Sequence, residues 1–184
     1  MKRILLLLAI SFFFIEAGAQ KYMTKTGYIG FYSHTPIEDI KADNNQVAGI
    51  LDISTGEIVF QVLIKSFHFE KTLMEEHFNE NYMESDKFPK STFSGKILNL
   101  SSVDFTKNGK YDVTVEGDLN MHNVTKKTTA KGVIEVITGG INATSRFNIA
   151  PEEFKITIPG IVRENIARSL EVTVKMNYLP LEKQ

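Results

Sequence analysis

The chain has 184 residues, of which 42% are hydrophobic and 10% aromatic, and its formal net charge is −1. This length suits one domain with a sizeable core, and the near-neutral charge argues against nucleic acid or an anionic membrane surface as a partner. The sequence has no cysteine, which excludes disulfides, thiolate catalysis and cysteine-ligated metal sites.

The N-terminus has the three parts of a secretory signal peptide. A basic start at Met1–Arg3 is followed by an apolar run over Ile4–Ile15 and by small residues over Ala17–Ala19. We therefore expect residues 1–19 to be a signal peptide and residues 20–184 to be the mature domain, located in the periplasm or secreted. The alternative is a retained N-terminal anchor. No second apolar run of spanning length follows, so the mature chain should have no transmembrane segment.

After Lys25 apolar residues recur at every second position, which is the pattern of strands with one buried face. The expected strands include the segments Ile29–Ser33, Val47–Ile53, Ile58–Ile64, Phe93–Leu98, Val113–Met121, Thr128–Thr138, Ile141–Ile149, Phe154–Ile158 and Leu170–Tyr178. Expected turns lie at Ser54–Gly56, Asn108–Gly109, Asn123 and Gly139–Gly140.

The period of two breaks between Glu70 and Lys87, where apolar residues fall at helix-like spacings, and Pro89 ends this segment. We expect a short helical crossover there. Aromatic and apolar residues around this crossover, such as Phe67, Phe69 and Phe78, could cap one end of the fold. Because the remaining strands are joined by turns without a βαβ rhythm, the fold class is all-β. A closed antiparallel barrel is favoured over a two-sheet sandwich.

Three segments, in the same order and at similar spacing, resemble the YceI-like family. Pro89-x-x-Thr92-Phe93 opens a strand after an aromatic-led approach, Val115–Lys126 is similar to a family hairpin, and Gly30–His34 is similar to the first strand. The chain departs from the family pattern in three places. Asn123 replaces the usual glycine of the hairpin, Pro151 stands where many members have arginine, and Lys155 replaces another glycine.

The resemblance implies an extended antiparallel eight-stranded, lipocalin-like β-barrel whose lumen binds a polyisoprenoid or another long-chain lipid. It implies no catalysis and no cofactor, and family members are often homodimers. The residues expected to line the lumen are Phe31, Phe60, Val62, Phe67, Met74, Phe93, Val115, Leu119, Met121, Phe147, Phe154 and Val172. Small inward residues, Gly49, Gly95 and Gly117, would leave space for the chain.

Inward apolar faces also fit an ordinary packed core, because every barrel has them. The alternative function is therefore a secreted stress or adhesion module with a filled barrel that acts through its surface. The four histidines, His34, His68, His77 and His122, have no metal-ligand spacing, although His34 or His122 could hydrogen-bond a lipid head group. The sequence has no nucleophile elbow, so a hydrolase is the weakest hypothesis.

Overall fold

The computed structural model describes residues 20–181, so the expected signal peptide lies outside the described residues. The strands are β1 (Lys21–His34), β2 (Asp39–Asp52), β3 (Glu57–Leu63), β4 (His68–Phe69), β5 (Lys90–Ile97), β6 (Gly109–Met121), β7 (Val124–Ile137), β8 (Gly140–Ile149) and β9 (Leu170–Pro180). The helix α1 spans Thr72–His77 and continues into a π-helical turn over Phe78–Tyr82. Four 3-10 turns lie at Ile64–Ser66, Leu100–Ser102, Pro151–Phe154 and Gly160–Val162.

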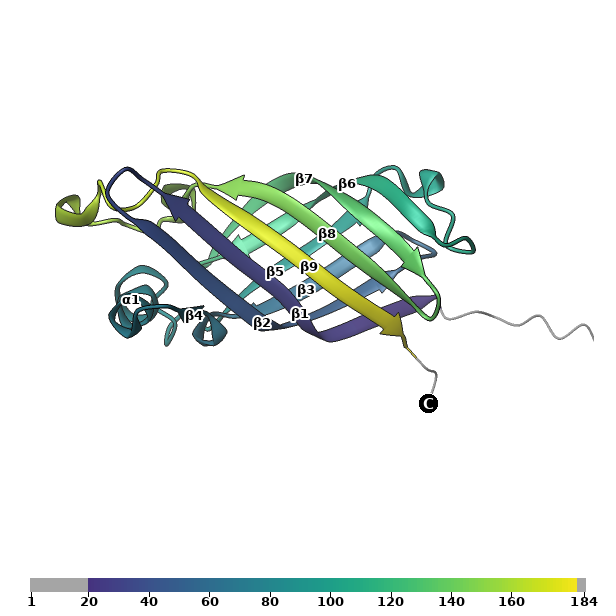
Figure 1. The fold of residues 1–184 in the computed structure, drawn as a ribbon, viewed down its shortest axis with the longest axis horizontal. Coiled ribbons are helices and arrows are strands. Elements are labelled where there is room, and N and C mark those ends of the chain that lie inside the picture. The colour runs from purple at the N-terminus through teal and green to yellow at the C-terminus, as the bar shows by residue number, and fades with distance from the viewer. Residues whose placement is uncertain (1–19, 182–184) are drawn as a thin grey trace, which may run out of the picture.

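Eight of the strands close into one antiparallel barrel (Figure 1). Hydrogen bonding follows the order β1-β9-β8-β7-β6-β5-β3-β2, and β2 pairs with β1 to complete the circle. Closure removes the exposed edges that an open sheet would present. The expected eight-stranded barrel with a short helical crossover is therefore confirmed, and the sandwich alternative is wrong. The two-residue strand β4 pairs with β2 beyond the end of β3.

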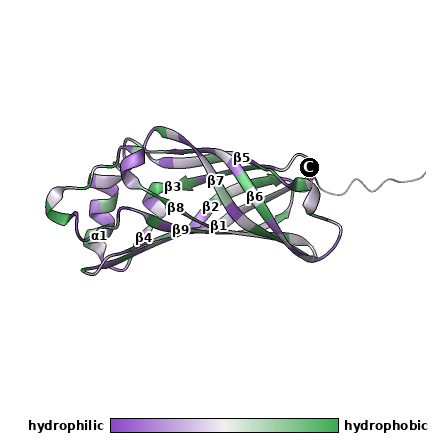
Figure 2. Ribbon diagram, turned by 90° about the horizontal axis from the view of Figure 1, so that it is seen from above, coloured by the Kyte–Doolittle hydropathy of each residue, from purple (hydrophilic) through white to green (hydrophobic). Residues whose placement is uncertain are grey.

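The alternation of side chains along the strands separates the lumen from the outer surface. In β9 the residues Leu170, Val172, Val174, Met176 and Tyr178 are buried, and those between them are more exposed. Figure 2 shows hydrophilic and hydrophobic residues interspersed along the strands in this way. Of the helices in the described part of the chain, none is long and apolar enough to span a bilayer.

Two local expectations are wrong. The segment Phe154–Ile158 is not a strand, because a 3-10 turn over Pro151–Phe154 ends at Lys155, whose φ of 58° is left-handed. Proline at the start of this turn already has the φ that the turn requires. The dipeptide Asn108–Gly109 is not a tight turn, since β6 begins at Gly109. The tight hairpin turn lies between β6 and β7, where His122 and the predicted Asn123 have φ of 51° and 57°.

The two ends of the lumen differ. At the end where β1 begins and β9 ends, inward side chains fill most of the space, and Leu51, Ile134 and Tyr178 are at most 1% exposed. The expectation that Gly95 and Gly117 leave space for a ligand is also wrong. A Cβ atom at these positions would lie 2.6 and 2.7 Å from the ring of Phe93, so that ring already occupies the space.

Candidate functional site

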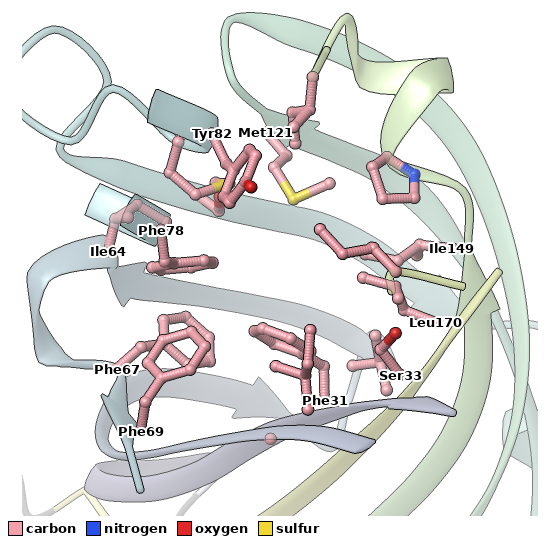
Figure 3. A pocket seen from close by; sticks show the side chains of 18 of the residues that line it. Phe31, Ser33, Ile64, Phe67, Phe69, Phe78, Tyr82, Met121, Ile149 and Leu170 are labelled. Atoms are coloured by element: carbon pink, nitrogen blue, oxygen red, sulfur yellow. The ribbon is translucent and has the colours of Figure 1, made fainter. Parts of the chain in front are cut away.

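The other end of the lumen contains an apolar cavity of about 240 Å³. It lies at the end of the barrel that carries α1 and the loop between β8 and β9 (Figure 1). In Figure 3, side chains from β1, the crossover, β6, β8 and β9 surround one central space. We call this end of the barrel the mouth. The crossover and the β8–β9 loop (residues 150–169) contribute to the wall of the cavity at this end.

Nine of the twelve residues predicted to line the lumen line this cavity. They are Phe31, Phe60, Val62, Phe67, Met74, Leu119, Met121, Phe147 and Val172. Phe93 and Val115 instead line a second cavity of about 80 Å³ that lies deeper in the barrel. Phe154 lines neither cavity, because the 3-10 turn places it in a buried cluster with Met83 and Ile156.

Sequence reasoning missed the contribution of the loop between β8 and β9. Its apolar residues Ile156, Ile158, Val162 and Ile166 line the cavity together with Pro151, the residue that replaces the family arginine. The spacing of four between Ile158, Val162 and Ile166 was the available signal, because it places apolar residues on one face of either a helix or a strand. The loop therefore supplies a wall of the cavity and not only a connection between strands.

Four phenylalanines pack together at the mouth. The ring of Phe31 in β1 lies 5.8 Å from Phe67, 5.8 Å from Phe69 and 5.7 Å from Phe78. The rings of Phe67 and Phe78 are 5.4 Å apart. These centroid distances are typical of favourable aromatic pairs. The rings of Phe67, Phe69 and Phe78 are therefore held against the barrel wall, which places the crossover beside the lumen as expected for a cap (Figure 3).

Glu38, in the turn between β1 and β2, connects both segments at the mouth. One carboxylate oxygen accepts a hydrogen bond from Nζ of Lys71 at 2.9 Å, and the other accepts from Nδ2 of Asn165 at 3.2 Å. The hydrogen bonds from Lys71 and Asn165 hold the pKa of Glu38 below its usual range, so this carboxylate is charged at neutral pH. The loop is also held by the amide of Ala167, which donates to Oγ of Ser33 at 2.9 Å.

The cavity offers few polar groups to a ligand. Of the described residues that line it, none is lysine or arginine. Two basic groups near the mouth are paired, since Lys71 contacts Glu38 and Arg163 contacts Glu152 at 3.1 Å. The hydroxyl of Ser91 is buried in the wall without a hydrogen-bond partner. The arrangement can therefore enclose an apolar chain, but it does not form a cationic site for a phosphate within the cavity.

His122 fastens the crossover to the hairpin between β6 and β7. Its Nε2 lies 3.1 Å from a carboxylate oxygen of Glu84, and its Nδ1 lies 3.2 Å from the backbone oxygen of Phe154. The ring of Phe88 packs edge-on against the imidazole at 4.4 Å. Both ring nitrogens are thus engaged by the protein. His34 is exposed and pairs with Asp39 at 2.6 Å, so neither histidine faces the cavity as a head-group partner.

We expect the contact between His122 and Glu84 to make the stability of the protein depend on pH. Hydrogen bonds from Lys87 and then from His122 hold the pKa of Glu84 below its usual range. A lowered pKa means that the stabilisation is present above the ordinary glutamate pKa of about 4.3 and is lost as pH falls through the lower folded value. Glu84→Gln should therefore lower the melting temperature at neutral pH, and its difference from the unmodified protein should shrink in acid.

The control is Glu80→Gln, which changes an exposed carboxylate in the same segment. Melting curves of both variants between neutral pH and about pH 3 test the idea, since that range crosses the ordinary pKa of glutamate. A Glu84→Gln difference that stays constant down to the acid end, or that Glu80→Gln reproduces, contradicts a role for this carboxylate in fastening the crossover.

Comparison with known proteins agrees with the fold. A family model for the YceI-like domain matches residues 22–178. A polyisoprenoid binding domain from Saccharophagus degradans superposes with a TM-score of 0.73 at 12% identity, over 89% of this chain and 99% of that one. BcnA from Burkholderia cenocepacia superposes with a TM-score of 0.68 at 11% identity, covering 82% and 95%.

The Campylobacter jejuni YCEI protein superposes with a TM-score of 0.64 at 16% identity, over 82% of this chain and 90% of that one. No curated protein sequence matches the chain. Identities this low show the common fold alone, whereas the family model covers most of the chain and includes the three segments that carry the sequence resemblance. The chain folds as an eight-stranded barrel with an apolar cavity at its capped end, and this family model matches nearly its whole length. The chain therefore belongs to the YceI-like family.

Proposed function

We propose that this chain is an exported lipid-binding protein that holds a polyisoprenoid or a similar long apolar chain in its barrel lumen, without catalysis. The observation that carries the proposal is the cavity of about 240 Å³, whose wall is formed almost entirely by aliphatic and aromatic side chains. The polyisoprenoid binding domain that shares this fold supports the choice of ligand class. Burial of an apolar chain contributes about 0.8 kcal/mol per CH₂ group, so such a wall needs few polar contacts.

Export supports the same function. The basic, apolar and small-residue parts of the first 19 residues are those of a signal peptide, which would deliver the domain to the periplasm or the exterior. Lipids that cross an aqueous compartment must be shielded from water, and a capped apolar lumen provides that shield. The Glu38 and His122 contacts hold the cap over the lumen, so binding and release would require these contacts to open.

Native mass spectrometry of the protein purified from its own cell envelope tests the proposal. We expect an adduct that dissociates as a lipid with a long apolar chain and that fluorescent isoprenoid or fatty-acid probes displace. The mass of the complex also tests the homodimer that the family resemblance suggests. Protein that carries no lipid and binds none of these probes would overturn the proposal.

The filled half of the lumen favours one other function. Leu51, Ile134 and Tyr178 close the distal end as an ordinary core would. A secreted stress or adhesion module would need only such a core and would act through its outer surface. The melting temperature of such a module would be the same with and without an apolar ligand. An unchanged melting temperature at saturating probe concentration would favour this function, because a ligand that binds the native state raises it.

A further inference from the structure

Three residues line both cavities of the lumen. Phe60 from β3, Leu119 from β6 and Phe147 from β8 contact the cavity at the mouth and also the smaller cavity behind it. The first cavity extends to Phe31 and the crossover, and the second extends to Ala143 and Tyr178 at the filled end. These three side chains therefore lie between the two spaces, and we call them the partition.

The partition is built from opposite walls of the barrel. In the order of strands, β8 is separated from β3 by three strands on one side, and β6 lies between them. Phe60 is held in place because its ring stacks on Phe93 at 5.1 Å with an interplanar angle of 19°. Phe93 is held in turn by the space that Gly95 and Gly117 leave for its ring. Phe60 is thus fixed by packing against Phe93. Phe60 and Phe147 are both half-buried, and Leu119 is 8% exposed.

The volumes of the two cavities indicate how many carbons of an apolar ligand chain can fit in each. An apolar cavity of about 150 Å³ is known to hold a six-carbon aromatic ring, and on that scale about ten carbons fit in the first cavity. The second cavity, of about 80 Å³, would take about three more on the same scale. A chain longer than the first cavity must either pass the partition or extend out of the mouth.

We propose that the partition limits the length of apolar chain that the protein encloses. This inference rests on the proposed lipid-binding function and adds the class of ligand segment: a single chain end of about ten carbons, on the cavity scale given above. Phe147 is the residue that determines the limit. A polyisoprenoid would be held by one end only, and its remaining length would lie outside the mouth.

A series of straight-chain primary alcohols tests the limit by displacement of a fluorescent probe. Each buried CH₂ group should tighten binding about fourfold until the chain is about ten carbons long, after which affinity should level off. In Phe147→Ala the chain can reach the second cavity and the space left by the ring. The level-off point should then move to chains longer by about three carbons or more, on the same volume scale.

Ala143→Leu is the matched control, because Ala143 lines only the second cavity. Alone it should leave the alcohol series unchanged, and combined with Phe147→Ala it should cancel most of the added length. A shorter limit in Ala143→Leu alone would overturn the proposal, since it would mean that chains already pass the partition. An unmoved limit in folded Phe147→Ala would also overturn it.

Leu119→Ala opens the partition from another strand and provides the same test if Phe147→Ala does not fold. The proposal and the function on which it rests fail differently. If the unmodified protein binds no alcohol of any length, the lipid-binding function is wrong. If it binds alcohols whose affinity keeps rising clearly beyond about ten carbons, only the limit at the partition is wrong, because each added CH₂ group is then still being buried.

Discussion

Val62→Asp should abolish the binding of apolar chains, whereas Val59→Asp should leave it intact. Both residues lie in β3, but Val62 is 2% exposed and lines the cavity, and Val59 is 49% exposed on the outer face. A carboxylate that is buried without a partner costs several kcal/mol, so the affinity should fall by more than about a hundredfold, which is 2.7 kcal/mol. Probe displacement on both variants measures the difference.

Val62→Thr keeps the shape of the side chain and adds only a hydroxyl, so its effect should lie between those of the unmodified protein and Val62→Asp. Melting curves establish that each variant is folded before binding is compared. The site assignment would be wrong if folded Val62→Asp and Val59→Asp bound the probes equally well, because the ligand would then not lie against the inward face of β3.

Gly117→Ala should cause the largest loss of stability among conservative substitutions in the barrel wall. A Cβ atom there would lie well inside contact distance of Cα of Gly95 and the backbone oxygen of Ser94 on the neighbouring strand. It would also lie 2.7 Å from the ring of Phe93. Backbone atoms of a paired strand cannot move aside without breaking the ladder, so the cost should be about 1–3 kcal/mol or more.

Gly160→Ala is the control for this substitution, because no heavy atom lies within 4 Å of a Cβ built at that position. Its effect on the free energy of unfolding should stay within about 0.5 kcal/mol, as for most surface changes. Urea unfolding of both variants measures the difference. If the two variants lose the same stability, the close approach of β5 and β6 at this point does not constrain the residue.

The strands could be predicted because their signal is local. Successive side chains of an extended backbone point to opposite faces, so the period of two in β6 and β9 predicted which residues face inward. The crossover could also be predicted, because its apolar residues do not follow the period of two. The same reasoning failed at Phe154–Ile158, where the alternation is present but proline and a left-handed Lys155 form a 3-10 turn.

The sequence could not predict in the same way which inward residues pack in the core and which line a cavity. Phe93 and Phe147 have the same strand pattern and the same residue type. Phe93 packs in the space above Gly95 and Gly117, which lie on its own and the next strand, and Phe147 lies between the two cavities. In the β8–β9 loop, Val162 and Ile166 also line the cavity, and they lie outside the alternating segment Phe154–Ile158.

The sequence by itself determined that inward and outward faces alternate, that the crossover interrupts them, and the family to which the chain belongs. Only the tertiary structure decided that one half of the lumen is mostly filled and that the larger cavity lies in the other half. The physical reason is that alternation is a property of neighbouring residues, whereas a cavity depends on side chains that meet across the barrel. Phe60 and Phe147 are far apart in the chain, and only the register of the closed sheet brings them to opposite sides of one space.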